Sequence, residues 1–148
     1  MTNKEIILEA CKHILLERMK HAEHAMREAQ ESSNSEEKSS AGDKYETGRA
    51  MGHLNRDMNA KQLAQARAAF LELNQIDLAR TVKIQKGALF TMNGKQYFVA
   101  IGIGTVKTTL GEVIVLSPTA PIAKAIWHLS ASETVLFNGQ KLTMETIE

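Results

Sequence analysis

The chain has 148 residues, enough for one ordinary domain or two small ones, and its 43% hydrophobic content is typical of a globular protein. A formal net charge of +1 gives no broad basic surface of the kind that duplex DNA binding usually needs. The sequence therefore disfavours nucleic-acid backbone binding as the main role and predicts no sequence-specific DNA binding.

Cysteine content and the N-terminal segment indicate the compartment. The single cysteine, Cys11, allows no internal disulfide, and a buried structural thiol in a reducing compartment is expected. The N-terminal segment mixes Lys and Glu with its apolar residues, unlike a signal peptide. No run approaches the roughly 18 apolar residues that a membrane span needs. We expect a soluble, cytoplasmic protein with no membrane partner.

A long first helix is expected from the N-terminal pattern. Thr2 and Glu5 have the spacing of a capping box, which marks a helix start. Apolar residues then recur at spacings of three and four, at Leu8, Cys11, Leu15, Met19, Ala22, Met26 and Ala29. The segment 31–42 is rich in Ser and lacks apolar residues, which predicts a turn into which the helix frays.

A second helix of similar length is expected from about Glu46. Its predicted stripe contains Met51, Leu54, Met58, Ala66, Phe70, Leu73 and Ile76. Helices of about 30 residues are about 45 Å long. Because two such helices can bury narrow stripes only against each other, residues 1–80 are predicted to form an antiparallel coiled-coil hairpin, with an acidic tip near residues 31–46.

From Thr81 the pattern becomes typical of short strands. Asn93-Gly94 and Asn138-Gly139 each separate two β-rich runs, which is the strongest short signal for a β-hairpin. Gly111 separates two further runs, and Pro121 suits the first turn of a short helix over residues 122–129. Residues 81–148 are therefore predicted to form a small antiparallel sheet packed by one helix, and the whole chain an α+β protein.

Two carboxylates at the expected tip, Asp43 and Glu46, allow two interpretations. As Asp-x-x-Glu before a helix they form a capping box, in which each side chain bonds the other's backbone. As an exposed acidic pair they form a weak Mg²⁺ site, because Mg²⁺ takes one or two protein carboxylates together with water and other ligands. The two interpretations are compatible, since a cap also holds the carboxylates in place.

Other polar groups give weaker signals. His21 and His24 share a helical face, but a third donor at metal-binding spacing is lacking, so a solvated face is expected. Basic residues recur along the second helix at Arg49, Arg56, Lys61 and Arg67. They form either a solvated face or a basic side toward a polyanion.

The chain resembles the Gre family of bacterial transcript-cleavage and elongation factors. The tip Gly42-Asp43-Lys44-Tyr45-Glu46 is similar to the family's Gly-Asp-x-x-Glu. The segment 116–125, which contains Ser117, Pro118, Pro121, Ile122 and Lys124, is similar to the family's C-terminal segment, where a Pro-Ile turn opens a helix. The order and lengths of the parts match across nearly the whole chain.

This resemblance implies an FKBP-like C-terminal domain that docks at the rim of the secondary channel of RNA polymerase, with Ser117, Pro118, Pro121, Ile122 and Lys124 as partner-binding residues. It implies that Asp43 and Glu46 reach the active centre and, only in the complex, help bind a second Mg²⁺ for cleavage of backtracked RNA near its 3′ end. The chain would then be a cofactor that activates the polymerase's own hydrolysis, and not itself an enzyme.

The surroundings of the tip differ from the family pattern. Thr47 stands where the family usually has Asn, and residues 48–52 replace a Glu-Tyr pair. This departure leaves a second hypothesis open: a non-catalytic, Gre-like regulator or inhibitor that binds the same channel. A prolyl isomerase, which an FKBP-like fold could suggest, is disfavoured, because residues 81–148 contain few aromatic residues and the small core should need several of them. Fold analogy alone does not establish the activity.

Overall fold

The structure, a computed structural model, describes the backbone of residues 1–38 and 42–148 and the side chains of residues 1–31 and 50–148. The chain forms two compact units. One combines Met1–His13 with Leu71–Glu148, and the other is Ile14–Phe70. The boundary at residue 80, which separates the helical from the strand-rich part of the sequence, stays a prediction.

Helix α1 spans Asn3–Lys38 and begins at the predicted capping box. The Glu5 backbone N–H donates to Thr2 Oγ1 at 3.2 Å, and the Thr2 backbone nitrogen donates to Glu5 Oε2 at 3.3 Å. The predicted stripe is buried or half-buried throughout. Residues 31–38 are helical, so the prediction that the turn begins at residue 31 is wrong; Glu and Lys in this segment are good helix formers and outweigh the serines.

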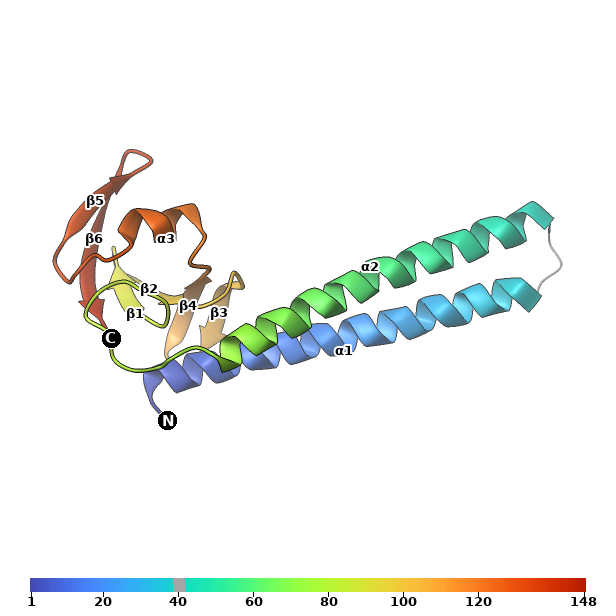
Figure 1. Cartoon of the computed structure of the whole chain (residues 1–148), viewed down its shortest axis with the longest axis horizontal. Coiled ribbons are helices and arrows are strands. Elements are labelled where there is room, and N and C mark those ends of the chain that lie inside the picture. The colour runs from blue at the N-terminus through green and yellow to red at the C-terminus, as the bar shows by residue number, and fades with distance from the viewer. Residues whose placement is uncertain (39–41) are drawn as a thin grey trace. The chain divides into compact units, whose positions relative to one another are not determined.

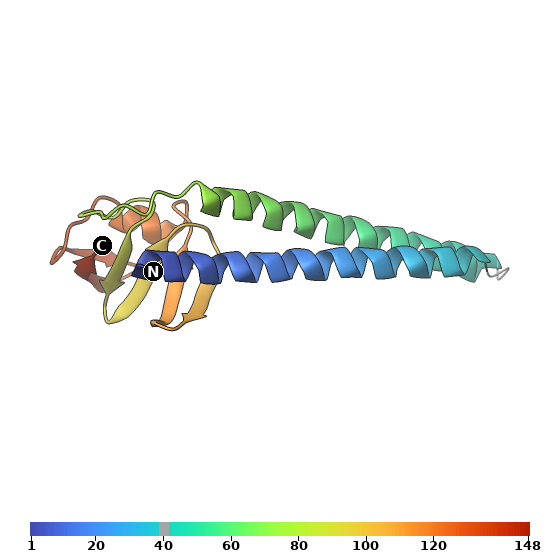
Figure 2. The same cartoon turned by 90° about the horizontal axis from the view of Figure 1, so that it is seen from below.

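Helix α2 spans Gly42–Asn74. Within the unit Ile14–Phe70, α1 and α2 lie side by side as an antiparallel hairpin in both views (Figure 1, Figure 2), as predicted. Gly52, Leu63 and Ala66 are buried on the α2 side of this unit.

The predicted stripe of α2 is wrong in its first half. Met51, Leu54 and Met58 are 53%, 53% and 56% exposed. Helical periodicity alone does not reveal which of two apolar faces meets the partner helix. The face that is buried instead contains Gly52, Leu63 and Ala66.

Six strands form one sheet with the order β3-β4-β2-β1-β6-β5. Their bounds are β1 Leu89–Met92, β2 Lys95–Val99, β3 Gly104–Thr108, β4 Gly111–Leu116, β5 Thr134–Phe137 and β6 Gln140–Ile147. The two Asn-Gly hairpins are confirmed as β1–β2 and β5–β6, with positive φ at both residues of each turn, as a type I′ turn requires. The sheet is mixed, because β2 and β4 pair in parallel, whereas the sequence predicts an antiparallel sheet.

The core of this sheet is closed by the short helix α3, Pro121–Ile126. Ala123 and Ile126 are fully buried, and Ile126 belongs to a cluster with Ile84, Ala88, Phe90, Met92, Val99, Leu142 and Met144. The predicted helix over 122–129 ends earlier, because Trp127 has a ψ of 134° and His128 a φ of 66°, both outside the helical region. A helical hairpin with a small sheet and one helix confirms the α+β class.

Candidate functional site

The acidic tip lies at the start of α2. The helix begins at Gly42, so Asp43 and Glu46 both lie within its first turns. A capping box would instead require Asp43 to lie just before the first helical residue. The side chains of both residues lie outside the described part of the structure, and so do the contacts that either interpretation needs. Their catalytic and Mg²⁺-binding roles stay predictions.

Metal ligands do not cluster elsewhere in the part of the chain with described side chains: no group of three or more His, Cys, Asp or Glu residues is placed to hold an ion there. His24 Nε2 lies 3.1 Å from Glu28 Oε1, one helical turn away, and both side chains are about two-thirds exposed. This agrees with the expectation that His21 and His24 lie on a solvated face.

One side of the hairpin carries a groove with three arginines. Arg27 of α1 and Arg56 and Arg67 of α2 line it, together with Glu23, Met26, Gln30 and Leu63, in a volume of about 370 Å³. Arg56 Nη1 donates to Gln30 Oε1 at 3.2 Å, and Arg67 Nη2 lies 3.3 Å from Glu23 Oε1. These bonds join the two helices and orient guanidinium groups, which bind carboxylates or phosphates well, along one flank.

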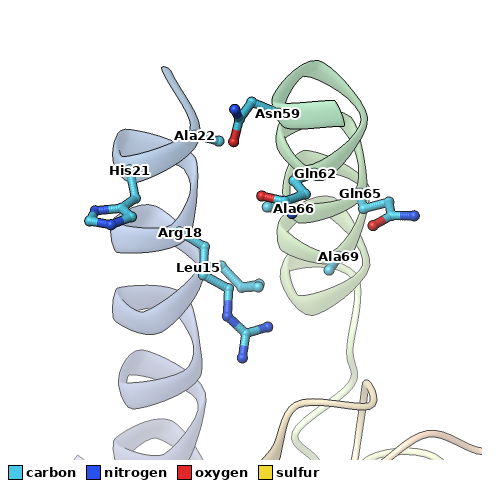
Figure 3. A pocket seen from close by; sticks show the side chains of 9 residues that line it. All are labelled: Leu15, Arg18, His21, Ala22, Asn59, Gln62, Gln65, Ala66 and Ala69. Atoms are coloured by element: carbon cyan, nitrogen blue, oxygen red, sulfur yellow. The ribbon is translucent and has the colours of Figure 1, made fainter. Parts of the chain in front are cut away.

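The opposite side of the hairpin has a hollow of about 340 Å³, shown in Figure 3. Its lining is Leu15, Arg18, His21 and Ala22 from α1 and Asn59, Gln62, Gln65, Ala66 and Ala69 from α2. In the figure the short alanine side chains leave a gap between the helices, and the amide of Gln62 points across it. The hollow arises because Ala22, Ala66 and Ala69 are too small to fill the space between the helices.

The predicted partner-binding segment lies around the start of α3. Ser117 Oγ accepts a hydrogen bond from the Thr119 backbone N–H at 3.2 Å, which fixes the turn. Pro121 occupies the first turn of α3 and is exposed, as is Lys124. Ser117 and Pro118 are half-buried, and Ile122 packs against the core cluster. The exposed groups available to a partner are therefore Pro121 and Lys124, while Ile122 contributes mainly to the fold.

A buried lysine ties the first turn of α1 to the segment after α2. Lys4 is 4% exposed and its Nζ donates to the Ala79 carbonyl at 2.9 Å. Burial lowers the pKa of Lys4, while the Glu148 and Asp77 carboxylates partly restore it. Nearby, Thr81 Oγ1 donates to the Glu148 carbonyl at 3.0 Å. The burial of Lys4 was not predictable from the sequence, where Lys4 is only a cation two residues after the helix cap.

Membrane crossing has no support in the described part of the chain, where no helix is both long and apolar enough to span a bilayer.

No protein-family model matches the chain, and no curated protein matches it. Among solved structures, the GreA factor homolog 1 (Gfh1) protein of Thermus thermophilus aligns with 93% of this chain and 94% of that chain. The aligned residues are 12% identical, with a TM-score of 0.35.

Proposed function

We propose that the chain is a transcription elongation factor of the Gre type. It binds RNA polymerase through the secondary channel and stimulates Mg²⁺-dependent cleavage of backtracked RNA. The polymerase supplies the catalytic site, so the chain acts as a cofactor in the cytoplasm and is not itself an enzyme.

The hairpin carries this proposal. Two antiparallel helices form it, and the Gly-Asp-x-x-Glu motif begins α2, four residues after α1 ends at Lys38. With 36 residues, α1 is about 54 Å long. A thin two-helix arm with carboxylates at the turn suits a narrow channel better than a compact active-site domain does.

The chemistry proposed for Asp43 and Glu46 is ion binding and water orientation. Carboxylate oxygens are the donors that Mg²⁺ prefers, but two of them fill only part of its six-coordinate shell, so the free protein is not expected to hold the ion. When bound between factor and polymerase, Mg²⁺ supplies Lewis-acid activation of a water molecule. Asp43 and Glu46 would hold the ion and would accept hydrogen bonds from that water, and the arginines of the groove would attract RNA phosphates.

RNA cleavage in stalled, backtracked elongation complexes tests the proposal. The wild-type protein is expected to shorten the transcript in the presence of Mg²⁺, and the double variant Asp43→Ala, Glu46→Ala to lose this activity while still binding the polymerase. Glu72→Ala serves as a matched control, because Glu72 is an exposed acid on the same helix, far along the chain from the tip. Identical RNA products from wild type and double variant would show that the tip carboxylates do not act in cleavage.

The departures around the tip favour a second candidate function. Thr47 and the two glycines Gly48 and Gly52 alter the surroundings of the carboxylates relative to the family pattern. A non-catalytic regulator would bind the polymerase and slow transcription without cleaving RNA, and the double variant would inhibit as well as the wild type. Inhibition that disappears together with the carboxylates would rule out this second function.

A further inference from the structure

Among the residues with described side chains, one face of α2 carries several exposed apolar groups. Positions 51, 54, 58, 62, 65 and 69 are separated by three or four residues, which places them on a single helical face. The half of this face nearer the tip carries the exposed side chains of Met51, Leu54 and Met58. The other half, at Gln62, Gln65 and Ala69, borders the hollow shown in Figure 3.

Protruding apolar groups and a hollow on the same face form a self-complementary surface. We propose that a second copy of this chain packs antiparallel on this face of α2, about a twofold axis near residue 60. In that arrangement Met51 of each copy lies opposite Ala69 of the other, and Leu54 lies beside Gln65. Met51 of one copy then extends into the alanine-lined hollow of the other, and the twofold axis forms this contact twice.

Charges beside the face support the antiparallel direction. Asp57 and Lys61 are both exposed and lie four residues apart, one on each side of the proposed axis. One oxygen of Asp57 lies 3.2 Å from Arg56 Nη2, and its other oxygen is the one proposed to meet Lys61 of the second copy. Twofold antiparallel pairing brings Lys61 of one copy within about 3 Å along the helix axis of Asp57 of the other. Two equivalent ion pairs, each between Lys61 of one copy and Asp57 of the other, therefore flank the apolar contacts. Such charge pairs determine the orientation of the two copies more than their affinity.

The side of the hairpin that carries the arginine groove is a poor site for the same pairing. Its groove is lined by Arg27, Arg56 and Arg67 with a single acid, Glu23. A symmetric pair through that side would place like charges against each other, which costs free energy when they lose water. The pairing is thus assigned to the face that contains Leu54.

The size of the face predicts a weak, reversible dimer. From residue 51 to residue 69 the helix rises about 27 Å. Such a contact buries less than the roughly 1,200–2,000 Å² of stable protein interfaces. We expect a dissociation constant on the order of 100 µM.

Sedimentation velocity on the full chain, from about 10 µM to about 500 µM, tests the pairing. The wild type is expected to shift from monomer to dimer over this range, and Leu54→Glu to weaken association at least tenfold. Leu71→Glu is the matched control, because Leu71 is equally exposed on α2 but lies on a different face, and it should leave association unchanged. Circular dichroism verifies that both variants keep their helices. A wild type that stays monomeric throughout, or equal weakening by the two variants, overturns the proposal.

Cross-linking tests the direction. A mixture of Met51→Cys and Ala69→Cys proteins is treated with a short bis-maleimide, which does not reach Cys11 because that thiol is buried. Antiparallel pairing yields cross-links between unlike copies. Links between like copies at position 51 would indicate parallel pairing and contradict the assigned geometry.

Discussion

Cys11 shows how burial sets the chemistry of one side chain. The residue is fully buried, and loss of hydration raises the pKa of its thiol to about 11 from a normal value of 9.0. Since the folded state disfavours the thiolate, the stability contribution of the neutral thiol is complete below pH 9 and is lost as the pH rises through about 11. A structural role for Cys11, as the sequence predicts, follows from this environment.

Folded protein is expected to react slowly with a thiol reagent. At pH 8 a rise in pKa of this size lowers the thiolate fraction about 100-fold, and burial also blocks access. Labelling with Ellman's reagent should be at least that much slower in buffer than in urea, where the same cysteine serves as its own control. Rapid stoichiometric labelling of the folded chain would contradict the burial of Cys11.

Gly87 and Gly104 form a matched pair for testing close backbone packing. Both have a φ of 91°, which only glycine adopts readily, but an added Cβ at Gly87 would lie 2.4 Å from the Asp77 carbonyl oxygen, whereas nothing lies within 4 Å at Gly104. Gly104→Ala should reduce the free energy of unfolding by roughly 1–2 kcal/mol, the cost of the strained φ alone. Gly87→Ala should cost at least about 2 kcal/mol more. Urea unfolding measures both, and equal losses would show that the Asp77 contact is not tight.

At the level of elements, short sequence motifs predicted the turns and hairpins but not the pairing of strands distant in the sequence. The Asn93-Gly94 turn needs positive φ at two adjacent residues, and few other dipeptides allow this, so the β1–β2 hairpin was predictable. The parallel pairing of β2 with β4 was not, because it joins strands separated by β3 and depends on how the β3–β4 hairpin folds back. In α2, two apolar faces compete, and only packing against α1 decides between them.

Two leucines of α2 test the corrected seam. Leu63 is 7% exposed and Leu54 is 53% exposed. Leu63→Ala should lower the free energy of unfolding of the hairpin by roughly 2–3 kcal/mol, because it leaves a cavity between the helices. Leu54→Ala should cost less than about 1 kcal/mol. Chemical denaturation followed by circular dichroism at low protein concentration compares them, and a reversed order would restore the seam predicted from periodicity.

At the level of the whole molecule, the two compact units do not follow the order of the chain. Met1–His13 belongs with Leu71–Glu148, although 57 residues separate them. The sequence predicted the kinds of element in each half but not this shared unit, because helical periodicity runs through α1 without a break at residue 13. The candidate site was predictable only through the motif at Asp43 and Glu46, since two acids at a helix start are common and their spacing alone does not identify a function.

Lys4 is expected to stabilise the unit that it joins. Lys4→Ala removes the hydrogen bond to the Ala79 carbonyl and the packing of the lysine stem, which should cost roughly 2 kcal/mol. Lys86→Ala is the control, because Lys86 is exposed in a turn of the same unit and its loss should change stability by less than about 0.5 kcal/mol. Thermal and urea unfolding measure both variants. Equal losses from the two substitutions would show that the Lys4 contact is not specific.

Because one unit combines Met1–His13 with Leu71–Glu148, it cannot complete its folding until both segments have been synthesised. Translation delivers Ile7, Leu8 and Cys11 before residues 71–148, and their apolar side chains are buried in a unit that needs those later residues. Until residues 71–148 leave the exit tunnel, this earlier segment carries exposed apolar groups that a chaperone can bind. The hairpin, whose contacts lie within Ile14–Phe70, can fold earlier.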